Sequence, residues 1–191
     1  MNDLDATSAL GDIVTPRLGL RVMGPRVVDA CLAGDLVEAG RLLGVAVPAE
    51  LLEQPAGLVY GKAQLDADPD YLPWSGRAMI LAGSGAMVGH VRFHSRPDPE
   101  DLRRYARDAV ELAYTVFEAH RRHGYASEAV GAAMDWAQDN FGIRRFVASV
   151  SPRNVASLGL VARLGFSRVG EHIDEVDGIE HVFMREQAER G

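Results

Sequence analysis

The sequence predicts an α/β fold in which helices cover one mixed β-sheet. Two observations support this prediction. Two segments with strand character, Arg77 to Ala82 and Ala86 to His94, flank a glycine-rich turn and predict an antiparallel hairpin. Later in the chain, strand patterns at 110–117 and 145–150 flank a helical pattern at 124–140, which is the order of a parallel β-α-β unit. A chain with both connections needs a sheet of antiparallel and parallel strands.

The elements before the hairpin follow from hydrophobic periodicity. Residues 1–14 are expected to form a loose tail, and residues 15–191 a single domain. Apolar residues alternate with polar or small ones over 18–22 and predict the first strand. Apolar residues at helical spacing over 27–43, interrupted by Gly34, predict two short helices.

The remaining segments are identified mainly by prolines and glycines, which interrupt helices and strands. Four prolines between residues 48 and 73 mark an irregular region, in which we expect one short helix at 49–54. A stretch at 95–108, rich in proline, aspartate and arginine, is expected to be a mobile connection. Gly142 is expected to end the long helix, because glycine tolerates the left-handed backbone found there. The last predicted elements are a helix at 155–163 and two strands near 166–173 and 179–185.

Composition narrows the class of protein. A chain of 191 residues with 47% hydrophobic and 25% charged residues is typical of one soluble domain with a sizeable core. The net charge of −7 argues against a general nucleic-acid binder. No apolar run approaches the ~20 residues that span a bilayer, and Met1 to Gly11 lacks the features of a secretory signal. Cys31 is the only cysteine, which excludes an internal disulfide. We expect a cytoplasmic protein without membrane partners, and a homodimer is an open alternative to a monomer.

A candidate phosphate-binding loop follows the strand at 110–117. Arg121, Gly124 and Ala126 form an R-x-x-G-x-A pattern at the start of the long helix. The first turn of a helix offers unpaired N–H donors and the positive end of a dipole. Gly124 leaves room for a diphosphate to approach the backbone, and Ala126 is nearly as small. The pattern therefore predicts a site for an anion such as a diphosphate.

This loop resembles the coenzyme A pyrophosphate loop of the GNAT acetyltransferase superfamily. Three further segments are similar to its RimJ/RimL branch, the ribosomal-protein N-terminal acetyltransferases and their relatives. They are Thr15-Pro-Arg-Leu18-Gly-Leu-Arg21, Glu111-Leu-Ala-Tyr114, and Asn154-x-x-Ser157 followed by Leu164-Gly165-Phe166. The resemblance implies an α/β/α sandwich around a mixed, centrally splayed β-sheet. It also implies direct acetyl transfer from acetyl-CoA to a primary amine of a protein N-terminus, an amino acid, a polyamine or an antibiotic.

The resemblance also implies which residues bind the coenzyme. In this chain they are Val116, Arg121, Arg122, His123, Gly124, Tyr125, Ala126 and Asn154. Arg122 stands where the family usually has a glycine. Independently of the family, Asn154 is expected to cap the helix at 155–163.

Catalysis requires a base, because an amine is largely protonated at neutral pH. Glu111 is the leading candidate; its alternatives are a surface position or pairing with Arg77 or Arg92 across the sheet. The resemblance makes Glu175, near the last hairpin, a second candidate. It also places Ser157 near the coenzyme sulfur. Val161 occupies the position at which many relatives have a catalytic tyrosine, so that route to a proton donor is absent.

Acceptor binding is assigned to Tyr71, Trp74 and His94, because relatives use these segments for specificity. Tyr60 lies in the same variable region as the two aromatic residues, and packing is the alternative for all three. The alternative for His94 is a structural histidine with its hydrogen bonds satisfied. The histidines form no metal-ligand pattern, and we expect no metal site. Two other functions stay open: a catalytically silent acyl-CoA-binding or sensing module, and a nucleotide-binding regulatory domain that uses the same loop.

Overall fold

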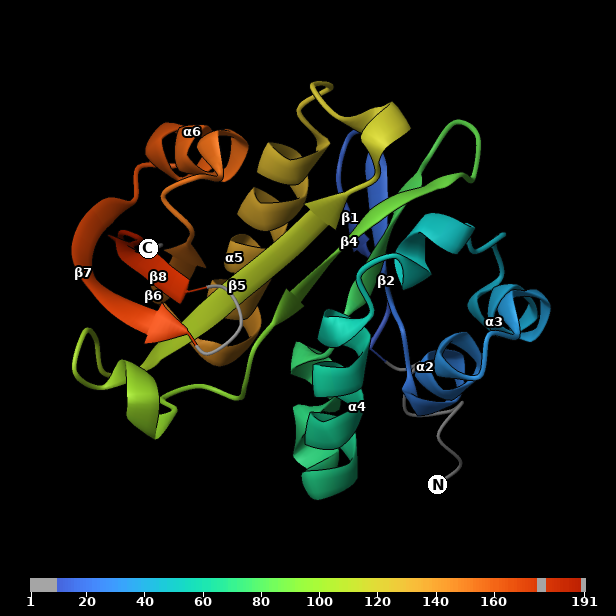
Figure 1. Cartoon of the computed structure of the whole chain (residues 1–191), viewed down its shortest axis with the longest axis horizontal. Helices are drawn as coiled ribbons and strands as arrows, with labels where there is room; N and C mark the ends of the chain where they lie inside the picture. The colour runs from blue at the N-terminus through green and yellow to red at the C-terminus, as the bar shows by residue number, and fades with distance from the viewer. Residues whose placement is uncertain (1–9, 175–177, 190–191) are drawn as a thin grey trace.

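The structure is a computed structural model that describes residues 10–174 and 178–189, and its centre is one mixed β-sheet (Figure 1). The strands of this sheet lie in the order β1-β2-β3-β4-β5-β6-β8-β7. Every neighbouring pair is antiparallel except β5 and β6, which are parallel. The strands are β1 (Ile13–Val14), β2 (Leu18–Val22), β3 (Arg77–Leu81), β4 (Met87–Phe93), β5 (Ala109–Val116), β6 (Arg145–Val150), β7 (Ser167–Asp174) and β8 (Gly178–Glu186). The predicted mixed sheet is confirmed.

Helices pack on both faces of the sheet. The α-helices are α2 (Pro25–Leu32), α3 (Leu36–Leu43), α4 (Ala56–Ala67), α5 (Tyr125–Phe141) and α6 (Val155–Arg163). Short 3₁₀ helices are η1 (Ala49–Leu52), η2 (Pro69–Trp74), η3 (Glu100–Leu102) and η4 (Glu118–His120). Within the described parts of the chain, none of the helices combines the length and apolar character needed to cross a membrane.

Two predictions about local structure are wrong. Residues 13 and 14 are not part of a loose tail, because Ile13 and Val14 form β1 and pair with Leu20 and Gly19 of β2. The irregular region contains α4, a helix of 12 residues that the sequence analysis missed. Its pattern is weak because Gly57 and Gly61 interrupt the apolar spacing, and glycine disfavours helix formation.

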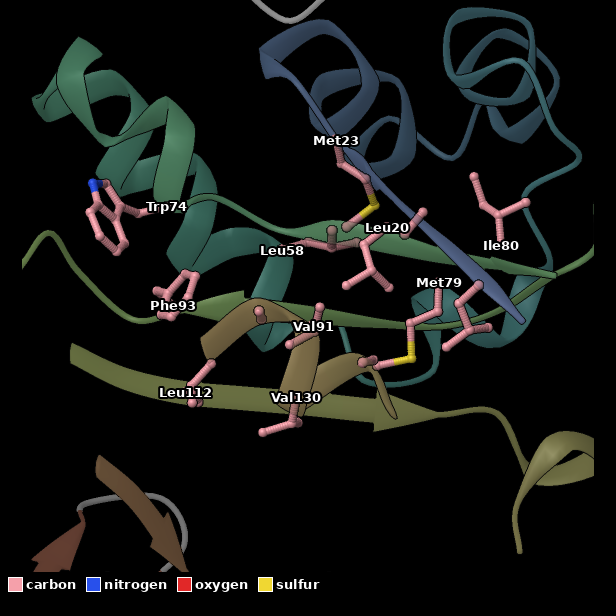
Figure 2. Close-up of a cluster of buried hydrophobic side chains, with 14 of the residues drawn as sticks. Leu20, Met23, Leu58, Trp74, Met79, Ile80, Val91, Phe93, Leu112 and Val130 are labelled. Carbon is pink, nitrogen blue, oxygen red and sulfur yellow. The ribbon is translucent and has the colours of Figure 1, made fainter. Parts of the chain in front are cut away.

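The two faces of β4 and β5 have different neighbours. On one face, Val91, Phe93 and Leu112 belong to the buried core together with Val130 of α5. Figure 2 shows these four side chains within the cluster. Side chains one position away along the strands must point to the opposite face, because strand residues alternate. That second face carries Arg92 and Glu111, and α4 covers it.

The parallel strands β5 and β6 separate after a short stretch of pairing. Their register runs from Ala109 and Arg145 to Glu111 and Val147. From Leu112 to Val116, β5 remains in register with β4 alone among the described strands. Figure 1 shows β5 crossing the molecule between β4 on one side and the β6–β8 pair on the other. The sheet is thus splayed at its centre, as the resemblance implied.

Candidate active site

The predicted phosphate loop connects β5 to α5. The Nε of Arg121 donates a hydrogen bond to the carbonyl oxygen of Val116 at 3.1 Å, which ties the loop to the end of the strand. Gly124 begins α5 in the left-handed conformation, with φ of +81°. Arg122 also has a positive φ, +65°, a conformation that glycine adopts more readily than arginine.

The loop leaves a row of backbone donors available. Within the described residues, the N–H groups of residues 122–127 donate no hydrogen bond to the protein. The first backbone hydrogen bond of α5 runs from the N–H of Glu128 to the carbonyl of Gly124, at 3.1 Å. Consecutive unpaired N–H groups at a helix N-terminus suit an anionic ligand. The residues present therefore fit a diphosphate.

Residues from the start of the chain brace this loop, and the sequence analysis missed their role. The Nε of Arg17 lies 2.6 Å from Oε2 of Glu128. The Nη1 of Arg17 donates to the carbonyl oxygen of His123 at 2.8 Å. Thr15 Oγ1 donates to Oε1 of Glu128 at 2.6 Å. Thr15 and Arg17 belong to the quoted opening motif, but the motif gives no sign of their shared partner Glu128, which lies 113 and 111 residues away in the sequence.

Glu111 lies where β5 and β6 separate, and its carboxylate is largely buried. The residue is 8% exposed. Its Oε1 accepts a hydrogen bond from the N–H of Ser149 on β6 at 3.2 Å. Its Oε2 lies 3.7 Å from Nδ1 of His94, whose side chain is 33% exposed. The structure thus brings together a predicted base and a predicted acceptor-site residue.

Two residues beside this pair were not predicted as site residues. The ring of Tyr60 on α4 lies 5.6 Å from the ring of His94, and the guanidinium of Arg92 lies 5.3 Å from the Tyr60 ring centroid. Burial lowers the pKa of Arg92, while Tyr71, Tyr60 and Glu111 act in the opposite direction. A Cβ at Gly57 would lie 3.2 Å from Nε of Arg92, so the missing side chain lets α4 approach the strand. Tyr60 lies in the variable segment that the resemblance connects with acceptor specificity, but because α4 was missed, its position beside His94 was not predicted.

Asn154 and Ser157 lie on the other side of the splayed strands, at the start of α6. Asn154 caps this helix as predicted, its Oδ1 accepting from the N–H of Ser157 at 3.0 Å. Ser157 also lies beside the hydroxyl of Tyr114 from β5. Burial raises the pKa of Tyr114, opposed by Ser157 and Arg163. The Tyr114 hydroxyl is buried without a well-formed hydrogen bond to any described residue.

The predicted roles of Tyr71 and Trp74 in acceptor binding require correction. Tyr71 is 0% exposed, and its hydroxyl donates to the carbonyl oxygen of Phe93 at 2.6 Å. Trp74 is 3% exposed and packs edge-on against Phe93 and Trp136, with ring centroids 5.1 and 5.6 Å apart. Neither side chain reaches a surface from which a substrate could enter. Both are core residues, placed there by η2.

Two remaining predictions concern Glu175 and metal binding. Glu175, the second candidate base, lies outside the described residues. Among residues 10–174 and 178–189, no cluster of three or more histidine, cysteine, aspartate or glutamate side chains has the arrangement of a metal site.

Comparison with known proteins gives a consistent family assignment. Residues 54–167 match the family described as the acetyltransferase (GNAT) domain. The uncharacterized N-acetyltransferase YoaA of Bacillus subtilis (strain 168) is 26% identical over 159 residues, 82% of either chain. The uncharacterized N-acetyltransferase YnaD of the same organism is 23% identical over 92 residues. That match covers 48% of this chain and spans about half, 49%, of the length of YnaD.

Solved structures share the fold. An acetyltransferase of the GNAT family from Bacillus anthracis superposes with a TM-score of 0.61 at 17% identity, covering 92% of this chain and 98% of that one. A ribosomal-protein-S5-alanine acetyltransferase from Vibrio fischeri superposes with a TM-score of 0.60 at 17% identity, covering 91% and 94%.

Proposed function

Because the chain belongs to the GNAT acetyltransferase family, we propose that it is an N-acetyltransferase that uses acetyl-CoA to acetylate a primary amine. The observation that carries this proposal is the loop after β5. Its N–H groups from 122 to 127 have no acceptor among the described residues, and Gly124 contributes no side chain that could cover them. This is the arrangement that a diphosphate requires.

The coenzyme residues follow from this loop. The N–H groups of Arg122 to Ala126 would hold the diphosphate, with Arg121 adding charge. Val116 and Asn154 lie at the ends of β5 and α6 that flank the gap in the sheet. When bound there, acetyl-CoA supplies an activated acetyl thioester. Ser157 and Tyr114 are the hydroxyl groups that this side of the gap offers as proton donors.

The chain's own residues would remove the proton from the amine. An amine that is protonated at neutral pH must lose that proton before it can attack the thioester, and a buried carboxylate is suited to accept the proton. Glu111 is held by Ser149 and lies 3.7 Å from the partly exposed ring of His94. This pair gives a proton a route from a buried acceptor to the protein surface.

The acceptor amine would enter on the face covered by α4. Glu111 and Arg92 both belong to that face of the sheet, while α5 covers the other. His94 keeps its assignment to the acceptor site, and Tyr60 replaces Tyr71 and Trp74 there. The acceptor class stays a primary amine, on a small molecule or a peptide; the names of several structural relatives indicate ribosomal proteins as their own substrates.

The proposed function is tested by measuring free CoA released from acetyl-CoA with a panel of amines. We expect Glu111→Gln to lower kcat by roughly 10²–10⁴-fold, since glutamine keeps the size but cannot accept a proton. Acetyl-CoA affinity should change little, and the loss should shrink at high pH, where the amine deprotonates without a base. Glu171→Gln is the matched control, because Glu171 is an exposed strand glutamate on β7.

Two other outcomes would identify the alternative functions. Binding of acetyl-CoA without CoA release for any amine would favour a silent acyl-CoA-binding module. Thermal stabilisation by ATP or NAD, and not by acetyl-CoA, would favour a nucleotide-binding regulatory domain. Full activity of Glu111→Gln would exclude Glu111 as the base.

A further inference from the structure

Arg17 contacts the coenzyme loop although it lies near the start of the sequence, more than 100 residues before the loop. We propose that Arg17 is the positioning residue of this loop, and that it holds residues 122–126 in the shape that presents their N–H groups to a diphosphate. The role of the loop in coenzyme binding rests on the proposed function; the bracing contacts themselves are structural.

Arg17 contacts residues on both sides of Gly124 in the sequence. Nη1 donates to the carbonyl oxygen of His123, the residue before Gly124. The guanidinium carbon lies 4.9 Å from the ring centroid of Tyr125, the residue after it. Nε pairs with Glu128, one turn further along α5. One planar group therefore fixes a carbonyl, a ring and a carboxylate on both sides of the glycine.

The anchor of this arrangement is Glu128 in the first turn of α5. Its carboxylate accepts from Thr15 Oγ1 and from both the backbone N–H and the side chain of Arg17. Burial opposes ionisation of Glu128, but these hydrogen bonds outweigh it and lower the pKa of the carboxyl group. The side chain is 14% exposed. A largely buried ionised group with three donors is a defined anchor point.

The loop needs such a brace because its backbone is unfavourable by itself. Arg122 and Gly124 both have positive φ within three positions, and this conformation is sterically unfavourable for a non-glycine residue such as Arg122. A conformation of this kind persists where surrounding contacts determine it. Among the described residues, Arg17 is the side chain from outside the loop and α5 that contacts the His123 backbone.

The proposal is tested with Arg17→Gln and Arg17→Lys. Lysine keeps the charge but cannot hold a carboxylate and a carbonyl in one plane, so both variants should behave alike if Arg17 positions the loop. Arg21→Gln is the matched control, because Arg21 belongs to the same opening segment, pairs with Asp12 and also donates to a backbone carbonyl, that of Leu43. Their side chains are similarly exposed, 47% and 39%.

Two measurements decide the outcome. In the ligand-free protein, the N–H groups of Arg121 and Glu128 donate to the carbonyls of Glu118 and Gly124, at 3.2 and 3.1 Å. Amide hydrogen exchange at these two residues should accelerate in both Arg17 variants, and not in the control. Calorimetric titration should show acetyl-CoA binding weakened about tenfold or more. The KM of S-acetylpantetheine, which lacks the diphosphate, should stay unchanged. Glu128→Gln, which weakens the anchor from the other side, should reproduce both effects and replaces any Arg17 variant that does not fold.

Unchanged exchange at Arg121 and Glu128 would overturn the proposal, whatever the activity. Native acetyl-CoA affinity of the Arg17→Lys variant would also overturn the proposal, because it would show that only the positive charge of Arg17 matters. Equal losses for acetyl-CoA and S-acetylpantetheine would indicate a general structural effect and would also overturn it. If the wild-type protein bound no acetyl-CoA, the proposed function would fail, and the exchange result would still decide whether Arg17 braces the loop.

Discussion

A pair of glycines at the two ends of α5 allows coenzyme binding to be separated from backbone strain. Gly124 at the start of the helix has φ of +81° and ψ of 4°, and Gly142 at its end has φ of +69° and ψ of 13°. A Cβ at Gly142 would meet no atom within 4 Å, and one at Gly124 would lie 3.3 Å from Nη2 of Arg17. Valine at either position must therefore adopt a similar unfavourable conformation, but only Gly124 faces the candidate diphosphate site.

The expected magnitudes follow from this comparison. Strain in the left-handed region costs about 1–3 kcal/mol, which lowers the Tm of a protein of this size by about 2–4 °C for each kcal/mol. Gly124→Val and Gly142→Val should therefore melt at similar, lower temperatures. Only Gly124→Val should weaken acetyl-CoA binding, by tenfold or more, which is at least about 1.4 kcal/mol. Calorimetric titration and thermal melting of both variants measure these quantities. Equal acetyl-CoA affinity in the two variants would refute the assignment of the loop.

Two further predictions concern residues outside the loop. Trp74→Ala should cost about 3–5 kcal/mol of stability, measured by denaturant unfolding, because it empties a buried aromatic cluster; a selective rise in acceptor KM without loss of stability would contradict this. Burial, with a smaller effect of Arg92, lowers the pKa of His90 to about 4 from 6.5. The unfolded chain then binds a proton that the folded chain does not, so stability should fall as the pH drops from about 6.5 to 4, by at most about 3 kcal/mol. His90→Gln should reduce that loss in unfolding measured against pH, and an unchanged pH dependence would show that His90 is not responsible.

The second half of the fold was predictable because its signals are local. Helix α6 begins after Asn154, whose side chain caps it, and α5 ends at Gly142 in the left-handed conformation. Residues of this type restrict the backbone within one or two positions. Elements bounded by them, such as β6 and α6, therefore lie where the sequence places them.

The candidate site was predictable only in part, because several of its contacts join distant segments. Nothing local marks Glu128 as the partner of Arg17, or shows that Tyr60 faces His94. Burial is also a property of the whole fold. Tyr71 and Trp74 look like binding residues in a proline-rich segment, but η2 turns both into the core. The residues of the loop, by contrast, were identified by a motif that is contiguous in the sequence.

The separation of β5 and β6 affects the position of the candidate base Glu111. The sheet has two halves: strands β1 to β5 form one, and strands β6, β8 and β7 form the other. Each half comes from one continuous part of the chain, and the few residue pairs between β5 and β6 join them. The hydrogen bond from the Ser149 N–H to Glu111 crosses this junction just beyond the last of those pairs. A change in the separation of the halves would stretch that bond and displace the carboxylate. The position of the Glu111 carboxylate therefore depends on the distance between β5 and β6. Any molecule that lies between these strands would change both together.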